Sequence, residues 1–289
     1  MFHTFQISEG DGDDDVDDHD HGETKTNTST NRDVLQKLPV YMQLQILAFL
    51  RYKDNTLTGR TSSHLHTLWK NNKQLPLFVP EDCATLQEAV GRVHGDDRLT
   101  TIVVGKGEHQ IHGNYLYIPS AMNIVGDPEV PKEEIAVVGG VYFNDWIQGN
   151  CHLQHLTLRQ AEWNGVVGQS SFTMDDVLVE QCGGYGVVAF GTGVVGRCTN
   201  VEVRQCDLSG VYASKGASIT LIGAKTTVHH NSKDGDSDEY GLQVVGSSAT
   251  IQLVSPLTKE QVSLDNSGGG NWGAEKGGDI NQIKTIAEW

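Results

Sequence analysis

The hydrophobic pattern between residues 150 and 275 is a series of short alternating strands, each followed by a turn and a glycine beside an apolar residue. Alternation of apolar and polar residues over a few positions is typical of β-strands with one buried face. The strands are Leu156-Thr-Leu158, Val177-Leu-Val179, Val201-Glu-Val203, Thr226-Thr-Val228 and Val262-Ser-Leu264. The glycine pairs are Gly165-Val166, Gly186-Val187, Gly210-Val211, Gly241-Leu242 and Gly273-Ala274.

The spacing of these glycines is 21, 24, 31 and 32 residues. A coil of three short strands and three turns needs a little over about 20 residues, so the pattern indicates one coil per repeat, with loops inserted in the last two. Stacked coils pair each strand with its neighbours and bury the apolar side chains, and such parallel connections are almost always right-handed. Residues 77–289 are therefore predicted to form a right-handed parallel β-helix of about eight coils.

Equivalent positions of successive coils are expected to carry the same residue type. Gln160, Gln181 and Gln205 align, which predicts a structural ladder of hydrogen-bonded amides. Cys182 and Cys206 also align. The chain has five cysteines, an odd number without CxxC spacing, so free thiols are expected, although a disulfide between these two is geometrically open.

The segment that precedes the repeats has the order of an extended stretch, a short helix near Ala84–Val90 and a strand at Thr101–Val104. This order resembles the start of many pectate-lyase-like β-helices, in which the helix plugs the first coil. The resemblance implies the same plug here, with the apolar side of the helix facing the interior.

Residues 34–76 have helical hydrophobic spacing, and they are expected to form a helical hairpin or three-helix unit. Leu38-Pro39, then Ile46-Leu47-Ala48-Phe49-Leu50, and later Arg60 and Trp69 are similar to the F-box. That resemblance implies docking on the adaptor subunit of a cullin-type ubiquitin ligase. The contact residues would be Leu38, Pro39, Ile46, Leu47 and Leu50. A helical cap that seals the β-helix is the alternative for this segment.

Residues 1–33 form an acidic segment with almost no apolar residues from residue 8 onward, which predicts a disordered tail. It accounts for −8 of the net charge of −16, because eight Asp and two Glu face one Lys and one Arg. This charge argues against nucleic-acid binding. The N-terminus lacks a basic start followed by an apolar stretch, so we expect a cytoplasmic or nuclear protein without a membrane anchor.

Catalytic and metal-binding patterns are weak. Asp175-Asp176 is the one adjacent carboxylate pair in a clear coil, and we expect a solvated or turn role for it, with one of the two side chains pointing outward. Strand alternation places His152 and His155 on opposite faces, which does not suit a shared metal. No cofactor is expected. In an inserted loop, aspartates stand at every second position and make a weak candidate for a calcium-binding site; they are Asp234, Asp236 and Asp238.

Two functions from different classes follow. The first is a non-catalytic interaction protein, monomeric outside a complex, whose F-box-like segment engages the ligase adaptor while the β-helix recruits a target protein. This combination resembles F-box proteins that carry β-helix repeats. The second is a carbohydrate-binding or carbohydrate-active β-helix protein, by analogy of fold. Aromatic residues near the glycine pairs are predicted to line the target-binding edge; they are Trp163, Tyr185, Tyr212, Tyr240 and Trp272.

Overall fold

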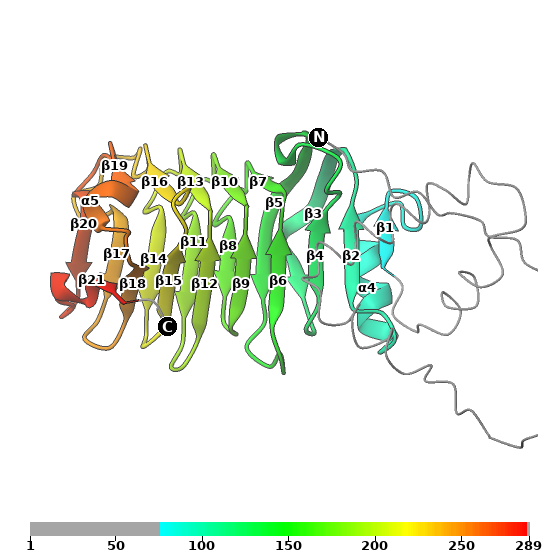
Figure 1. The fold of residues 1–289 in the computed structure, drawn as a ribbon, viewed down its shortest axis with the longest axis horizontal. Helices are drawn as coiled ribbons and strands as arrows, with labels where there is room; N and C mark the ends of the chain where they lie inside the picture. Colours follow the sequence, from blue (N-terminus) through cyan, green and yellow to red (C-terminus); the bar gives the residue numbers. More distant parts are fainter. Residues whose placement is uncertain (1–75, 288–289) are drawn as a thin grey trace, which may run out of the picture. The chain divides into compact units, whose positions relative to one another are not determined.

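A computed structural model describes residues 76–287, which form a parallel β-solenoid. Strands from successive coils lie side by side along the long axis of the solenoid (Figure 1). The acidic tail predicted for residues 1–33 lies outside the described residues. So does the F-box-like segment, apart from its last residue, with all five of its predicted contact positions.

The first sheet, which we call the polar sheet, is a stack of nine parallel strands. Its outward positions form a row of mainly polar side chains that begins at Thr101, Asn123 and His152. In order, its strands are β1 (Leu77–Val79), β2 (Thr101–Val104), β4 (Asn123–Gly126), β6 (Cys151–Gln154), β9 (Phe172–Asp175), β12 (Val195–Thr199), β15 (Ser218–Ile222), β18 (Thr250–Val254) and β21 (Ile283–Ile286).

Two further rows of strands make up the rest of each coil, and β5 (Ile135–Phe143) links them because it runs through the corner between them. The long strand β3 (Gly107–Ile118) pairs with β5 along its length. One row, which we call the charged sheet, continues from the start of β5 with β7 (Thr157–Arg159), β10 (Leu178–Glu180), β13 (Glu202–Arg204), β16 (Thr227–His229) and β19 (Ser263–Leu264). The other row, which we call the tyrosine sheet, continues from the end of β5 with β8 (Val166–Gly168), β11 (Val187–Phe190), β14 (Val211–Ser214), β17 (Tyr240–Val245) and β20 (Gly270–Glu275).

The corners are made by single residues in the left-handed backbone region, repeated on successive coils. After the charged sheet, Gln160, Gln181 and Gln205 have φ of 53°, 55° and 58°. Their amides bond along the stack, from Gln160 Nε2 to Gln181 Oε1 at 3.4 Å and from Gln181 Nε2 to Gln205 Oε1 at 3.3 Å. The predicted glutamine ladder is confirmed, and it turns the chain from one sheet to the next.

The residue after each ladder position points into the core and explains the repeated glycines. Cys182 and Cys206 occupy this place, followed by Asn231 in the next coil. A Cβ on Gly186 would lie 2.3 Å from Val203 Cγ1 and 3.2 Å from Cys206 Sγ, so only glycine fits there. All five cysteines are buried free thiols, in agreement with the expectation.

The core is one continuous apolar column inside the coils. Helix α4 (Leu86–Gly95) covers its N-terminal end with Leu86, Ala89, Val90 and Val93, as predicted for a plug. Thr85 begins this helix by accepting a hydrogen bond from the backbone N–H of Glu88 at 3.1 Å. The short helices η1 (Lys132–Glu134), α5 (Lys259–Val262) and η2 (Ile280–Gln282) lie in the connecting turns.

Three details of the predicted repeat differ in the structure. Val228 pairs with Ser263 rather than with Leu264, so the predicted strand Val262-Ser-Leu264 is offset by one residue and Leu264 is exposed. The solenoid has about six turns rather than about eight. The pair Gly273-Ala274 is also not the fifth repeat. Leu242 pairs with Trp272, so Trp272 takes the position of the apolar residue and the expected register was shifted by two.

Candidate binding face

All six tyrosines between residues 76 and 287 lie on the outer surface of the tyrosine sheet. We call this surface the tyrosine face; its tyrosines are Tyr115, Tyr117, Tyr142, Tyr185, Tyr212 and Tyr240. Strand alternation sets the direction of Tyr115, Tyr117, Tyr142 and Tyr212, because their neighbours Leu116, Val141 and Val211 are at most 1% exposed in the core. Tyr185 and Tyr240 instead stand at the corner, directly before Gly186 and Gly241.

One outward row runs through the face along the solenoid axis. Tyr117 pairs with Tyr142, Tyr142 with Val167, Val167 with Val188, and Val188 with Tyr212. The row ends at Gln243 and Gly273 on the last two strands. Val167, Val188 and Gln243 are at most 5% exposed, so the tyrosines are the accessible side chains of the row. Parallel strands are about 4.8 Å apart, so the six intervals of this row extend over about 29 Å.

The first tyrosine cluster stands where β3 and β5 meet. Ring centroids of Tyr117 and Tyr142 are 5.4 Å apart, and those of Tyr115 and Tyr142 are 5.5 Å apart. The hydroxyl oxygen of Tyr115 accepts hydrogen bonds from Asn164, from its backbone N–H at 3.2 Å and from Nδ2 at 3.1 Å. Tyr117 is 54% exposed, so the cluster offers ring edges to a ligand while Tyr115 is held in place.

The second cluster joins three coils. Ring centroids of Tyr185 and Tyr212 are 4.5 Å apart, and the Tyr185 hydroxyl donates to Glu239 Oε1 at 3.0 Å. Glu239 Oε2 accepts from the Ser209 hydroxyl at 2.6 Å and from the Ser209 backbone N–H at 3.2 Å. Burial and, after it, the Glu239 charge raise the pKa of Tyr185 well above its usual value, so it stays protonated.

Tyr240 repeats this arrangement one coil further on. Its hydroxyl donates to Glu275 Oε1 at 3.2 Å, and its ring lies across Gly273, where an added Cβ would come within 2.2 Å of the ring. This contact gives the physical reason for Gly273, which the sequence pattern had assigned to a corner. Burial first, and then the Glu275 hydrogen bond, raise the pKa of Tyr240.

The structure brings together part of the predicted aromatic set. Tyr185, Tyr212 and Tyr240 lie on the tyrosine face, and Trp163 stands in the turn at its edge with 53% exposure. Trp272 instead packs against the core end, with Lys259 Nζ 5.2 Å from its ring centroid. The residues that sequence reasoning missed are Tyr115, Tyr117 and Tyr142. The available signal was the Tyr115-Leu116-Tyr117 alternation, which is typical of a strand with one buried face.

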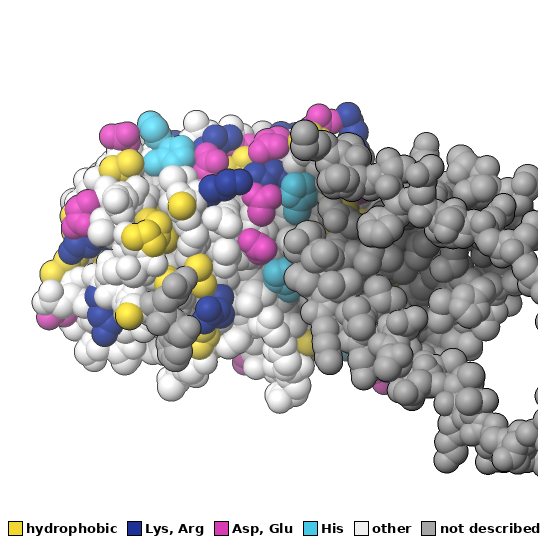
Figure 2. Space-filling view, viewed as in Figure 1, with side chains coloured by type: hydrophobic (Ala, Val, Ile, Leu, Met, Phe, Trp, Pro, Cys, Tyr) yellow, Lys and Arg dark blue, Asp and Glu magenta, His cyan; other side chains and the backbone are white. Residues whose placement is uncertain are grey.

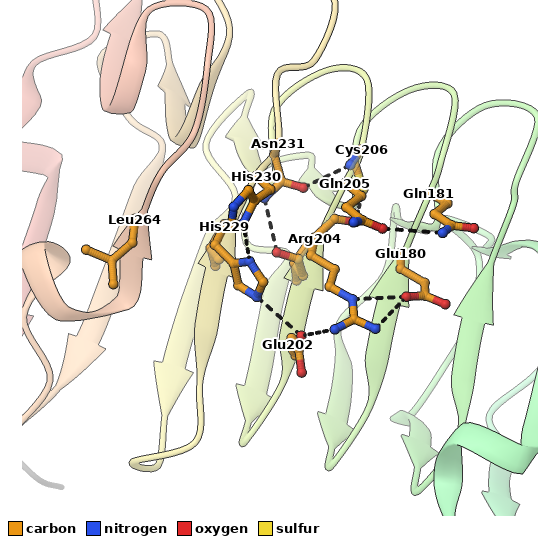
Figure 3. Close-up of polar contacts among 12 residues, drawn as sticks. Glu180, Gln181, Glu202, Arg204, Gln205, Cys206, His229, His230, Asn231 and Leu264 are labelled. Carbon is orange, nitrogen blue, oxygen red and sulfur yellow. Dashed lines mark hydrogen bonds and ion pairs between the residues drawn. The ribbon is translucent and has the colours of Figure 1, made fainter.

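The neighbouring outer surface, on the charged sheet, has its side chains occupied with one another. Arg204 donates to Glu180 Oε2 through Nε at 3.0 Å and Nη2 at 2.8 Å, and to Glu202 Oε1 through Nη1 at 2.8 Å (Figure 3). His229 Nε2 contacts the same Glu202 oxygen at 3.2 Å. Acidic and basic side chains intermingle over β7, β10, β13 and β16 (Figure 2). We call this surface the charged face; its residues are Arg159, Glu180, Glu202, Arg204 and His229.

The predicted acidic pair is divided between two environments. Asp176 is a corner residue with φ of 52°, bonded to Lys132 Nζ at 2.7 Å and His155 Nδ1 at 2.8 Å. Asp175 stands on the polar sheet, where burial raises its pKa, and the outward His152 contacts Thr173 Oγ1 at 2.7 Å. His155 also contacts the Val130 carbonyl at 2.9 Å, so the two histidines have separate structural partners.

The calcium candidate lies in the exposed loop between β16 and β17. Asp234, Asp236 and Asp238 are all exposed there, and the Asp238 carbonyl accepts a hydrogen bond from Gln243 Nε2 at 2.6 Å. Within residues 76–287 no group of three or more His, Cys, Asp or Glu side chains is arranged to hold a metal ion. The loop therefore gives the calcium candidate no geometric support.

Comparisons with known proteins add no family. No protein family model, no curated protein and no solved structure matches this chain significantly. In the described part of the chain, no helix combines the length and apolarity that a membrane crossing requires. The structure defines a parallel β-solenoid with three outer faces of different chemistry.

Proposed function

We propose that this chain is a non-catalytic interaction protein in which the tyrosine face binds a target and the F-box-like segment docks on a cullin-type ligase adaptor. The observation that carries the proposal is the gathering of every tyrosine in residues 76–287 on one outer face. Tyrosine provides a large contact area with few rotatable bonds, which makes it frequent in binding hot spots.

The contrast between faces supports the choice of surface. Side chains of the charged face have most of their hydrogen-bonding capacity taken up by one another. Tyr117, Tyr142 and Tyr212 present hydroxyls that bond to no residue within 76–287, and their rings lie along one axis. A partner that covers this row would bury aromatic surface and reach free donors at the same time.

The adaptor half of the proposal is tested by a pulldown from a eukaryotic cell lysate. The intact chain is compared with the Ile46→Asp, Leu50→Asp double variant, and the ligase adaptor and cullin are probed directly. We expect both proteins to be recovered with the intact chain and reduced at least about tenfold with the variant. Equal recovery, or none with either chain, would remove the adaptor role and leave residues 34–76 as a structural cap.

The target half is tested in the same lysate with a Tyr117→Ser, Tyr212→Ser variant. Glu202→Gln on the charged face serves as the matched control. Partners that depend on the tyrosine face should be lost with the double variant and kept with the control. If every captured protein persists in both, the tyrosine face is not the recruiting surface.

A carbohydrate ligand is the second candidate, because Tyr117, Tyr142 and Tyr212 lie along one axis of the solenoid. Aromatic rings stack on sugars, and aromatic residues along one axis suit a linear chain. Titration with neutral and acidic polysaccharides would separate the carbohydrate-binding function from the protein-binding function. If a polysaccharide binds the parent chain and the Tyr117→Ser variant does not bind it, the tyrosine face is a carbohydrate-binding face.

A further inference from the structure

The carboxylates of the tyrosine face differ from those of the charged face in having no cation beside them. Glu180 and Glu202 are paired with Arg204. By contrast, the carboxylates beside the tyrosines form no ion pair with any residue that the structure describes; they are Asp145, Asp238, Glu239 and Glu275. The face therefore combines aromatic rings with uncompensated negative charge.

Each tyrosine group has its own carboxylate. Asp145 follows β5 by two residues, close enough to Tyr142 to raise the pKa of that phenol after burial and Tyr117. Glu239 accepts the Tyr185 hydroxyl, and Glu275 accepts the Tyr240 hydroxyl. A carboxylate beside an electron-rich ring is the arrangement that attracts ammonium and guanidinium groups, through charge and through the face of the ring.

The solenoid already uses this contact where it has a lysine available. Lys215 Nζ lies 5.2 Å from the centroid of the Phe190 ring, and Lys259 Nζ lies 5.2 Å from that of Trp272. No described lysine or arginine lies over any of the six tyrosine rings. Lys215 lies over Phe190, the last residue of β11, so one cation stands at the corner edge of the tyrosine sheet, but neither Lys215 nor Lys276 forms an ion pair with the four carboxylates in the described residues.

We propose that the partner of the tyrosine face is an extended, basic polypeptide segment whose lysine or arginine side chains insert between the tyrosine groups. This inference rests on the proposed function, since it names the chemistry of the target that the same face would bind. The row extends over about 29 Å, and an extended chain rises about 3.3 Å per residue, so about nine residues would cover it. The net charge of −16 would speed the encounter with such a segment.

The test is fluorescence anisotropy with the full chain and labelled ten-residue peptides in which serine alternates with lysine, glutamine or glutamate. We expect the lysine peptide to bind at least about tenfold more tightly than the glutamine peptide and to weaken as salt is raised. The glutamate peptide should not bind.

Two variants with the same change in net charge locate the effect. Asp145→Asn, Asp238→Asn, Glu275→Gln removes three charges at the tyrosine face. Glu81→Gln, Glu129→Gln, Glu133→Gln removes three exposed charges from turns outside it. The first should weaken the lysine peptide by about tenfold or more and the second by less than about twofold. The acidic segment 1–33 is unchanged in both, so its attraction for the peptide cancels.

The outcomes separate this inference from the function on which it rests. Equal weakening by both variants would mean that the peptide responds to overall charge, and the basic-peptide inference would be overturned. Peptide binding that ignores charge but is lost in Tyr117→Ser, Tyr212→Ser would also overturn it, while the tyrosine face would remain a binding surface. If no peptide and no lysate partner responds to the tyrosine substitutions, both the inference and the target half of the proposed function fail.

Discussion

The charged face and the tyrosine face are built by the same coils but differ in what their side chains contact. On the charged face, Arg204 is bonded to carboxylates from its own coil and from the coil before it. On the tyrosine face, rings pack on rings, and Tyr117 remains more than half exposed. In a solenoid, therefore, one outer surface can hold the stack together while another stays available for a ligand. Within a strand, alternation fixes which way a side chain points but not which residue type stands at that position.

The corner that both faces share should give the largest effect. Gly186→Ala would place a Cβ 2.3 Å from Val203 Cγ1 and 2.6 Å from the Gly210 carbonyl oxygen, so the core has to shift. We expect a loss of about 2–3 kcal/mol in the free energy of unfolding, measured by urea denaturation. Gly91→Ala is the control, since its helix position is open and should gain about 0.5–1 kcal/mol. Equal stability of the two variants would contradict the packing argument.

On the charged face, Arg204→Met should affect stability but not binding. It leaves Glu180, with a side chain 11% exposed, without its partner. We expect a loss of about 1–2 kcal/mol in urea unfolding, discounted for the partial exposure of the arginine, with peptide affinity unchanged. The double variant Glu180→Leu, Arg204→Met should recover most of that loss, because no unpaired carboxylate remains. A fall in affinity in either variant would show that the two faces are coupled.

Tyr117→Ser should give the reverse result. Because its ring is 54% exposed, unfolding should change by less than about 0.5 kcal/mol, while binding to the tyrosine face falls. Urea denaturation and anisotropy on the same preparation measure both quantities. A large loss of stability with unchanged binding would assign the tyrosine clusters to the fold.

The smallest expected effect is the change in the free energy of unfolding at acid pH. Burial alone would raise the pKa of Asp176, but hydrogen bonds from Lys132 and His155 hold it below its usual value. A lowered pKa contributes stability that is present above the unfolded value of about 3.9 and is lost as pH falls through the folded value. The stability gap between the parent chain and Asp176→Asn should therefore be present at pH 7 and close below about pH 4. A gap that is independent of pH would exclude the ion pair as its cause.

The repeating part of the fold could be predicted because each coil leaves several marks in the sequence. The glutamine ladder, the glycine before each apolar residue and the inward strand residues all recur from Leu156 to Val228. The register was misjudged at Gly273 because that glycine makes room for the Tyr240 ring and does not mark a corner. A glycine in a sequence does not say which neighbour it accommodates.

The candidate face was only partly visible for a related reason. In the first coils, β5 runs through the corner, and its own pair Gly140-Val141, which aligns with Gly165-Val166, was not included in the predicted repeat, so Tyr117 and Tyr142 were not placed on the same surface as Tyr212. Their meeting with Tyr212 depends on strand pairings between residues that are 21 to 25 positions apart in the chain. The F-box resemblance concerns residues outside the described part and stays a prediction.

The left-handed corner residues have a consequence for how this molecule can change in length. Each corner turns the chain with one residue, so a stretch such as residues 182–205, from one inward ladder cysteine up to the next, is a self-contained unit whose two ends meet identical surroundings. Duplicating such a unit would add one position to the tyrosine row without altering the coils on either side. The number of coils thus sets the axial length of the tyrosine face, and with it the length of the segment that we propose it binds.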